Sequence, residues 1–130
     1  MYSNNSHQKR YQKTLNFLNQ HIDPASLILD LGVKNSMSEL MQAHGYKVEN
    51  TQGEDLDEDQ EGLINSKAEV VTAFEILEHL LSPYQVLKSI KAKKLVASVP
   101  LKLWFSNAYR SKSHSRFHLS FWRLGCVLLF

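Results

Sequence analysis

Apolar residues near the N-terminus recur with the spacing of an α-helix. They fall at i, i+4, i+7 and i+11, as Tyr11, Leu15, Leu18 and Ile22. One apolar stripe of this kind predicts a helix, which we place over residues 8–22. The helix ends at Asp23, because Pro24 follows and the residue before a proline avoids the helical region.

Four short runs with apolar residues follow and predict strands. They cover residues 27–32, 46–49, 68–74 and 95–99, and Pro100 stops the last one. Three of the runs are almost continuously apolar, which is typical of strands that are buried in a parallel sheet. In the run at 46–49, apolar and polar residues alternate, which also favours a strand.

Capping signals place helices between these runs. Ser36 and Glu39 have the spacing of a capping box, and Ser82 and Gln85 have the same spacing around Pro83. These pairs predict helices that begin near each serine, and residues 75–81 form a further short helical segment. The connection from Glu49 to Glu61 holds seven acids and no base, so we expect it to be exposed.

Strands that alternate with helices predict one α/β domain over residues 1–130. We place its core at about 26–100 and an irregular or helical tail at 101–130. The predicted sheet is Rossmann-like and open, with mostly parallel strands and with helices on both faces. Ligands bind beyond the carboxyl ends of the strands in such sheets, so the residues after each run are the functional candidates.

Charge is distributed unevenly along the chain, although the net charge is only +2. All thirteen acids lie at or before Glu78, whereas residues 88–123 hold nine Lys or Arg and no acid. The basic stretch indicates either a face for an anionic partner such as RNA or a solvated surface, and we favour the second. A lone Cys126, without a signal peptide or a membrane-spanning run, indicates a cytoplasmic protein with no membrane partner.

Three segments carry recognisable sequence motifs. Residues 68–80 read AEVVTAFEILEHL and are followed by Pro83, residues 94–100 read KLVASVP, and residues 29–32 read LDLG. Together they resemble class I S-adenosylmethionine (SAM) methyltransferases. That family often has D-V-V-x-A-F-E-V-L-E-H-L and then a proline, a fifth strand that ends in S-V-P, and a similar end of its first strand. The resemblance covers about residues 25–122 and implies SAM as the cofactor.

The resemblance also implies which residues near the end of the first strand bind SAM. Asp30 takes the position of the acid that holds the methionine amino group. Gly32 takes the position of the first loop glycine, which lets the backbone approach the cofactor closely. Lys34 and Ser36 stand at the family's two other glycine positions.

Further positions match those that contact the rest of the cofactor. Gln52 stands where the family has the acid that binds both ribose hydroxyls, and Glu49 is the second candidate from its spacing. Asp55 resembles the acid that meets the adenine amino group. Phe74 and Glu75 match positions that line the cofactor pocket.

His79 and His118 are the catalytic candidates. His118, followed by Phe121, resembles a histidine that relatives carry near the substrate pocket, where it would act as a general base or orient the substrate. Glu75, Glu78 and His79 would share one face if helical, which could bind a divalent cation as in some O-methyltransferases. The alternative is a structural turn, and we predict no metal site.

The family normally continues after the 95–99 strand with a helix and an antiparallel hairpin. Only thirty residues follow Pro100, so we expect this hairpin to be lacking and the family's third strand to be vestigial or absent. The chain would then be a natural minimal form, a fragment or the product of a frame change near Ser113. The 95–99 strand would then be an exposed edge of the sheet. The apolar C-terminus could cover that edge, or the chain could form a homodimer through the exposed strand or through the C-terminus.

Two functions from different classes follow. The leading hypothesis is a SAM-dependent methyltransferase that acts on an unidentified acceptor, a small molecule or a nucleic acid. The alternative is a degenerate, non-catalytic methyltransferase-like module for binding or assembly. An unrelated nucleotide-binding α/β protein is disfavoured, because the sequence holds no phosphate-binding loop.

Overall fold

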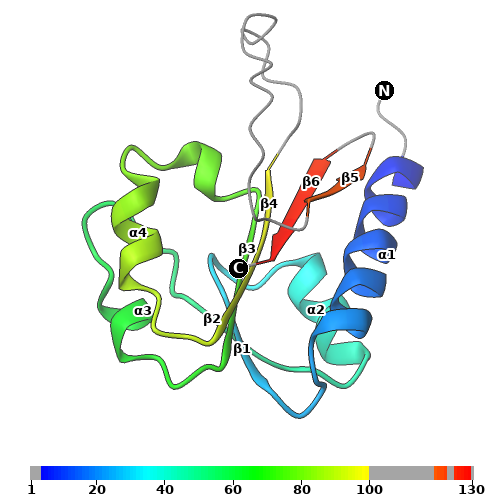
Figure 1. Cartoon of the computed structure of the whole chain (residues 1–130), viewed down its shortest axis with the longest axis horizontal. Helices are drawn as coiled ribbons and strands as arrows, with labels where there is room; N and C mark the ends of the chain where they lie inside the picture. Colours follow the sequence, from blue (N-terminus) through cyan, green and yellow to red (C-terminus); the bar gives the residue numbers. More distant parts are fainter. Residues whose placement is uncertain (1–3, 100–118, 123–124, 130) are drawn as a thin grey trace, which may run out of the picture.

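One open sheet organises the described residues, which are 4–99, 119–122 and 125–129 of the computed structural model (Figure 1). Its strands lie in the order β2-β1-β3-β4-β6-β5. Their bounds are Leu27–Asp30 for β1, Lys47–Asn50 for β2, Val70–Phe74 for β3, Lys94–Val99 for β4, Leu119–Trp122 for β5 and Gly125–Leu129 for β6. The first four strands are parallel, and β6 is antiparallel to both β4 and β5. The predicted Rossmann-like, mostly parallel sheet is therefore confirmed.

Helices cover both faces of this sheet. They are α1 (Asn4–His21), α2 (Ser36–Ala43), α3 (Glu61–Asn65), the short 3₁₀ helix η1 (Leu77–His79) and α4 (Pro83–Ser89). Figure 1 shows α1 and α2 on one side of the sheet and α3 and α4 on the other. Val70 packs in the core with Leu18 of α1, whereas its neighbour Val71 packs with Val86 of α4. Successive strand side chains point to opposite faces, so a strand covered on both sides is apolar at every position.

The caps of two helices differ from the sequence prediction. Asn35, not Ser36, caps α2: its side chain accepts from the backbone N–H of Met37 and of Ser38 at 2.9 and 3.1 Å. Ser38, not Glu39, closes the box, by accepting from the Asn35 N–H at 3.3 Å. The observed capping box therefore begins one residue earlier than the predicted one.

The predicted capping box of α4 is also wrong. Ser82 stands at the N-cap and Pro83 in the first turn, but the Ser82 side chain makes no capping hydrogen bond. The Asp57 carboxylate supplies the acceptors instead, at 2.8 Å from the N–H of Leu81 and 2.8 Å from the N–H of Ser82. An acid 25 residues away in the sequence therefore holds the entry to α4.

The prediction that the C-terminal hairpin is lacking is wrong. β5 and β6 form an antiparallel pair, from Leu119↔Leu128 to Trp122↔Gly125. β6 also covers the outer edge of β4, from Val96↔Leu129 to Val99↔Cys126. The prediction of an irregular or helical tail is therefore wrong for residues 119–122 and 125–129, and the rest of that tail lies outside the described residues. The prediction of an exposed β4 edge as a dimer surface is wrong, because β6 pairs with that edge. The alternative that the apolar C-terminus covers this edge is confirmed.

The sheet begins at β2, without a strand beyond it. Residues 51–69, all of them described, contain α3 and loops but no strand. The expectation that the third strand of the family is absent is confirmed for this segment. The acidic connection places a short helix beside β1 and β2 in its stead.

Candidate functional site

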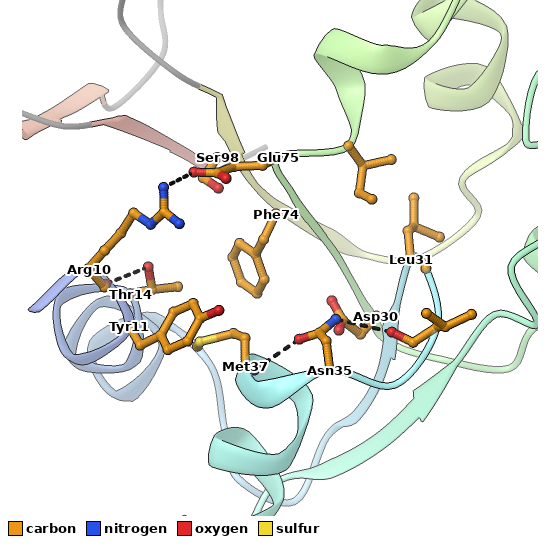
Figure 2. A pocket seen from close by; sticks show the side chains of 13 residues that line it. Arg10, Tyr11, Thr14, Asp30, Leu31, Asn35, Met37, Phe74, Glu75 and Ser98 are labelled. Carbon is orange, nitrogen blue, oxygen red and sulfur yellow. Dashed lines mark hydrogen bonds and ion pairs between the residues drawn. The ribbon is translucent and has the colours of Figure 1, made fainter. Parts of the chain in front are cut away.

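A cavity of about 310 Å³ opens at the carboxyl ends of β1, β3 and β4, where α1 closes one side (Figure 2). Its volume lies at the small end of the range for ligand pockets, roughly 300–1,000 Å³. The lining residues come from α1, from the β1–α2 segment and from the ends of β3 and β4: Arg10, Tyr11, Thr14, Asp30, Leu31, Gly32, Val33, Asn35, Met37, Phe74, Glu75, Ile76 and Ser98.

Asp30 lies at the floor of the cavity and is 1% exposed. Its Oδ1 accepts from the Thr72 hydroxyl at 2.6 Å, and its Oδ2 accepts from the Ser38 hydroxyl at 2.7 Å. The Asn50 amide donates to the same Oδ2 at 3.2 Å. Both carboxylate oxygens are thus occupied by neutral side chains of three different elements, so Asp30 joins β1, β2, β3 and α2.

Burial sets the ionisation of this carboxyl. Loss of water raises the pKa of Asp30 above its ordinary value, although the hydrogen bonds from Thr72, Ser38 and Asn50 act in the opposite direction. Hydrogen bonds from neutral donors only partly replace the hydration of a carboxylate. The group is therefore harder to ionise than a carboxyl on the surface.

The backbone after β1 turns sharply beside Asp30. Gly32 has φ +102°, a conformation that side-chain-bearing residues rarely adopt, and a Cβ there would lie 3.5 Å from Ile76 Cδ1. The Gly32 N–H donates to the Thr51 hydroxyl at 2.7 Å. Val33 then lies close to Gly53 in the loop after β2: a Cβ added to Gly53 would come within 2.7 Å of Val33 Cγ1. The loop keeps one glycine for its close turn but carries side chains where the family has two more.

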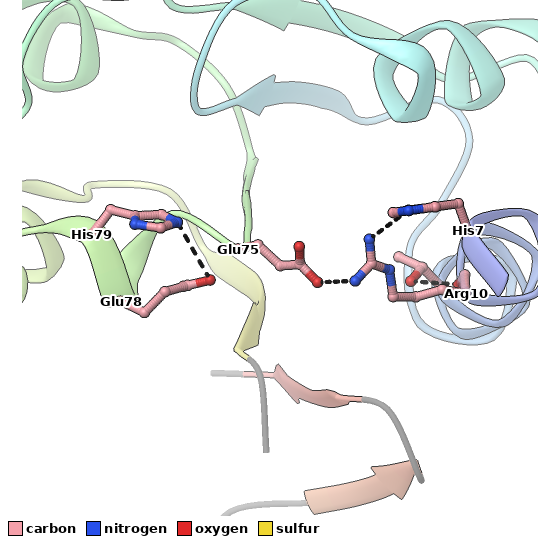
Figure 3. A network of polar contacts seen from close by, with 6 residues as sticks. His7, Arg10, Glu75, Glu78 and His79 are labelled. Carbon is pink, nitrogen blue, oxygen red and sulfur yellow. Dashed lines mark hydrogen bonds and ion pairs between the residues drawn. The ribbon is translucent and has the colours of Figure 1, made fainter. Parts of the chain in front are cut away.

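Glu75 stands at the opposite side of the cavity, directly after β3. Its φ of 56° is the positive value of a left-handed residue, and the backbone N–H is held by Ser98 O at 2.9 Å. This conformation costs energy for a residue with a Cβ and persists where the surroundings impose it. The carboxylate forms an ion pair with Arg10 of α1 (Figure 3), whose guanidinium also contacts His7 Nδ1 at 3.1 Å.

Four of the seven predicted cofactor-binding residues meet in this cavity: Asp30, Gly32, Phe74 and Glu75. Glu49 and Gln52 line a second cavity instead, of about 220 Å³, beside α3. Asp55 is exposed, and its carboxylate accepts from the Asp57 N–H at 3.0 Å in a tight turn. Three of the seven predicted residues therefore do not line the cavity that holds the other four.

His79, one of the two histidines predicted to be catalytic, does not line the cavity. The His79 side chain is 78% exposed, and its Nε2 lies 4.0 Å from Glu78 Oε1. His118 lies outside the described residues. Figure 3 shows Glu75 pointing toward Arg10 and away from the Glu78–His79 pair. The positive φ of Glu75 breaks the shared face that a helix would have given, and the described residues contain no group of three metal-ligating side chains.

Sequence reasoning missed the contribution of α1. Arg10, Tyr11 and Thr14 line the cavity, yet Arg10 lies 65 residues in sequence from Glu75, with which it pairs there. The helical stripe includes Tyr11 and predicts a face that packs on the sheet. Arg10 and Thr14 lie at i and i+4 beside that stripe, which is the signal that could have placed them near the strand ends.

Two solved structures share this fold. The 16S rRNA methylase ArmA matches with a TM-score of 0.61 and 11% sequence identity, over 96% of this chain and 83% of that chain. An rRNA methylase from Escherichia coli matches with a TM-score of 0.54 and 13% identity, over 95% of this chain and 65% of that chain. No family model and no curated protein matches the sequence. The described part of the chain has a methyltransferase fold, and none of its helices is long and apolar enough to cross a membrane.

Proposed function

We propose that this chain is a SAM-dependent methyltransferase whose cofactor binds in the cavity at the ends of β1 and β3. The observation that carries the proposal is the meeting of Asp30, Gly32, Phe74 and Glu75 around one cavity of a methyltransferase fold. Ligands of open α/β sheets bind at this edge of the sheet. The place of the cavity at this edge of the sheet and the residues that line it therefore both support the proposed cofactor site.

The residues present fit SAM in two respects. Gly32, with its positive φ and no side chain, leaves its backbone open to close approach, as a bound adenosine requires. Gly32, Val33 and Ile76 would hold the nucleoside, and Phe74 with Tyr11 would flank the sulfonium, which an aromatic face attracts.

SAM, when bound, supplies a methyl group that is already activated by the positive sulfur. The chain then needs to orient the cofactor, exclude water and align the acceptor for in-line attack. Phe74, Tyr11 and Met37 make one wall of the cavity apolar, and Met37 is 3% exposed. Their role in the proposal is to exclude water around the sulfonium.

The methyl acceptor in this proposal is either a small molecule or a nucleic acid. Both structural neighbours are rRNA methylases, so ribosomal RNA is the first acceptor to test. Residues 88–123 carry nine Lys or Arg and no acid, which suits an anionic acceptor.

Calorimetric titration of the purified chain with SAM and with S-adenosylhomocysteine tests the cofactor. Gly32→Ala and Gly45→Ala form a matched pair, because both glycines have positive φ, +102° and +92°, but only Gly32 lines the cavity. Both variants should lose similar stability, about 1 kcal/mol. Only Gly32→Ala should lose affinity, by about tenfold.

A transfer assay with methyl-labelled SAM and either ribosomal RNA or small-molecule extract then identifies the acceptor. Absence of heat with both ligands, for a wild-type chain that unfolds cooperatively, would contradict the enzyme and leave the non-catalytic module. Binding that Gly45→Ala weakens as much as Gly32→Ala would place the cofactor elsewhere.

A further inference from the structure

The Arg10–Glu75 ion pair is a feature of the cavity that the resemblance to known methyltransferases does not predict. Its two members come from α1 and from the end of β3, and each side chain remains about one-third exposed, at 33% and 36%. Figure 2 shows the pair at one end of the cavity, with the Phe74 ring between it and Asp30. Two opposite charges, supplied by two different elements, thus lie together at this end of the cavity.

Asp30 is poorly placed to hold an ammonium group. Both of its oxygens already accept hydrogen bonds, from Thr72, Ser38 and Asn50. Turning toward a ligand would leave the buried Thr72 and Ser38 hydroxyls without this acceptor, since both residues are 0% exposed. The acid at the end of β1 is therefore engaged in holding the sheet together.

Glu75 is placed as the available carboxylate. Its left-handed backbone, held by Ser98 O at 2.9 Å, directs its side chain across the cavity to Arg10. A partly exposed ion pair contributes little net stability, so a ligand that offers each member a new partner can open it. An α-amino acid group offers both partners at once, a carboxylate for Arg10 and an ammonium for Glu75.

We propose that Arg10 and Glu75 form the binding site for the zwitterionic amino-acid end of the cofactor, and that the ion pair between them opens when that end binds. The inference rests on the proposed function for the adenosine part of the ligand. Arg10 then binds the ligand carboxylate with its planar fork of donors. Glu75 takes the ammonium group, the role that the resemblance gave to Asp30.

Four ligands share the adenosine part but differ in the charged groups they carry, so they test the roles of Arg10 and Glu75 separately. S-adenosylmethionine and S-adenosylhomocysteine carry both groups, decarboxylated S-adenosylmethionine lacks the carboxylate, and 5′-methylthioadenosine lacks the whole amino-acid end. Calorimetric titration of Arg10→Gln should show affinity for S-adenosylhomocysteine lowered about tenfold or more. Decarboxylated S-adenosylmethionine and 5′-methylthioadenosine should bind Arg10→Gln within about twofold of wild type.

Glu75→Gln removes the negative charge of the ion pair. It should lower the affinity for S-adenosylhomocysteine and for decarboxylated S-adenosylmethionine alike, and leave the affinity for 5′-methylthioadenosine unchanged. Lys9→Gln is the matched control for Arg10→Gln, because it removes one exposed positive charge from the same helix. Arg10→Lys keeps the charge without the fork, so an intermediate affinity is expected, and it serves as the second variant if Arg10→Gln folds poorly.

The two proposals fail in different ways in this experiment. If the wild type binds none of the four ligands, the proposed function is wrong and the ion pair has no ligand of this class. If the wild type binds S-adenosylhomocysteine but Arg10→Gln weakens all ligands equally, or none of them, the cofactor site stands and the inference about Arg10 is overturned.

Discussion

Two carboxylates at the ends of neighbouring strands have opposite surroundings. Asp30, the last residue of β1, is 1% exposed and is held by Thr72, Ser38 and Asn50, which are all neutral. Glu75, after β3, is 36% exposed, has a strained backbone and contacts a single cation, Arg10. The same chemical group thus joins several elements at one strand end and pairs with one partly exposed cation at the other. Burial and neutral donors make Asp30 structural, whereas partial exposure leaves the Glu75 carboxylate accessible from the cavity.

Removal of the Asp30 carboxylate should have the largest effect. Asp30→Ala leaves the buried Thr72 and Ser38 hydroxyls without their acceptor and opens a small void. We expect the free energy of unfolding to fall by roughly 3 kcal/mol, measured by urea denaturation. Asp55→Ala is the control, since Asp55 is exposed, and it should cost no more than about 0.5 kcal/mol. Equal losses in the two variants would refute the structural role of Asp30.

The pH dependence of stability should report the buried acid next. Because burial raises the pKa of Asp30 in the folded chain, the unfolded chain ionises first as the pH rises above about 3.9. The stabilising contribution of the protonated form is complete below that pH and is lost as the pH rises through the folded pKa. Relative to Asp30→Asn, the wild type should therefore lose stability over this window. Urea denaturation of both proteins at several pH values measures this loss. A wild type that gains stability relative to Asp30→Asn as the pH rises would contradict the prediction.

Relief of the backbone strain at Glu75 should have the smallest effect. Glycine adopts φ 56° without a Cβ clash, so Glu75→Gly should be more stable than Glu75→Gln by about 1 kcal/mol, although both lose the ion pair. Glu49 lies in the extended strand β2. There Glu49→Gly should be less stable than Glu49→Gln by about 0.5–1 kcal/mol, because glycine weakens a strand. Thermal unfolding of the four variants measures both differences, and the same sign at both positions would remove the argument for strain.

Local patterns were sufficient for the parallel part of the fold. Val70 and Val71 pack on opposite faces of the sheet, so a strand covered on both sides has to be apolar at every position, and this pattern is visible in the sequence. The same reasoning failed for the last strands. β6 forms by pairing with β4 about thirty residues earlier, and a short apolar run does not reveal whether it will be a strand or a helix.

The candidate site likewise has a part that the sequence predicted and a part that it did not. Motif positions identified Asp30, Gly32, Phe74 and Glu75 as neighbours, because residues after parallel strands meet at one edge of the sheet. The loop after β2 is different. Gln52 lies two residues beyond the strand end, and the loop carries it into the second cavity. No local pattern specifies that direction, since a loop conformation depends on what packs against it.

The sequence by itself determined the alternation of strands and helices and the acids that follow the strands. Periodicity and turn residues act over a few positions, so they are readable without a structure. Only the tertiary structure decided what each acid does. Three neutral donors from α2, β2 and β3 surround Asp30, and an arginine 65 residues away meets Glu75. The role of a carboxylate depends on its burial and its partners, and chain segments that are distant in sequence supply both.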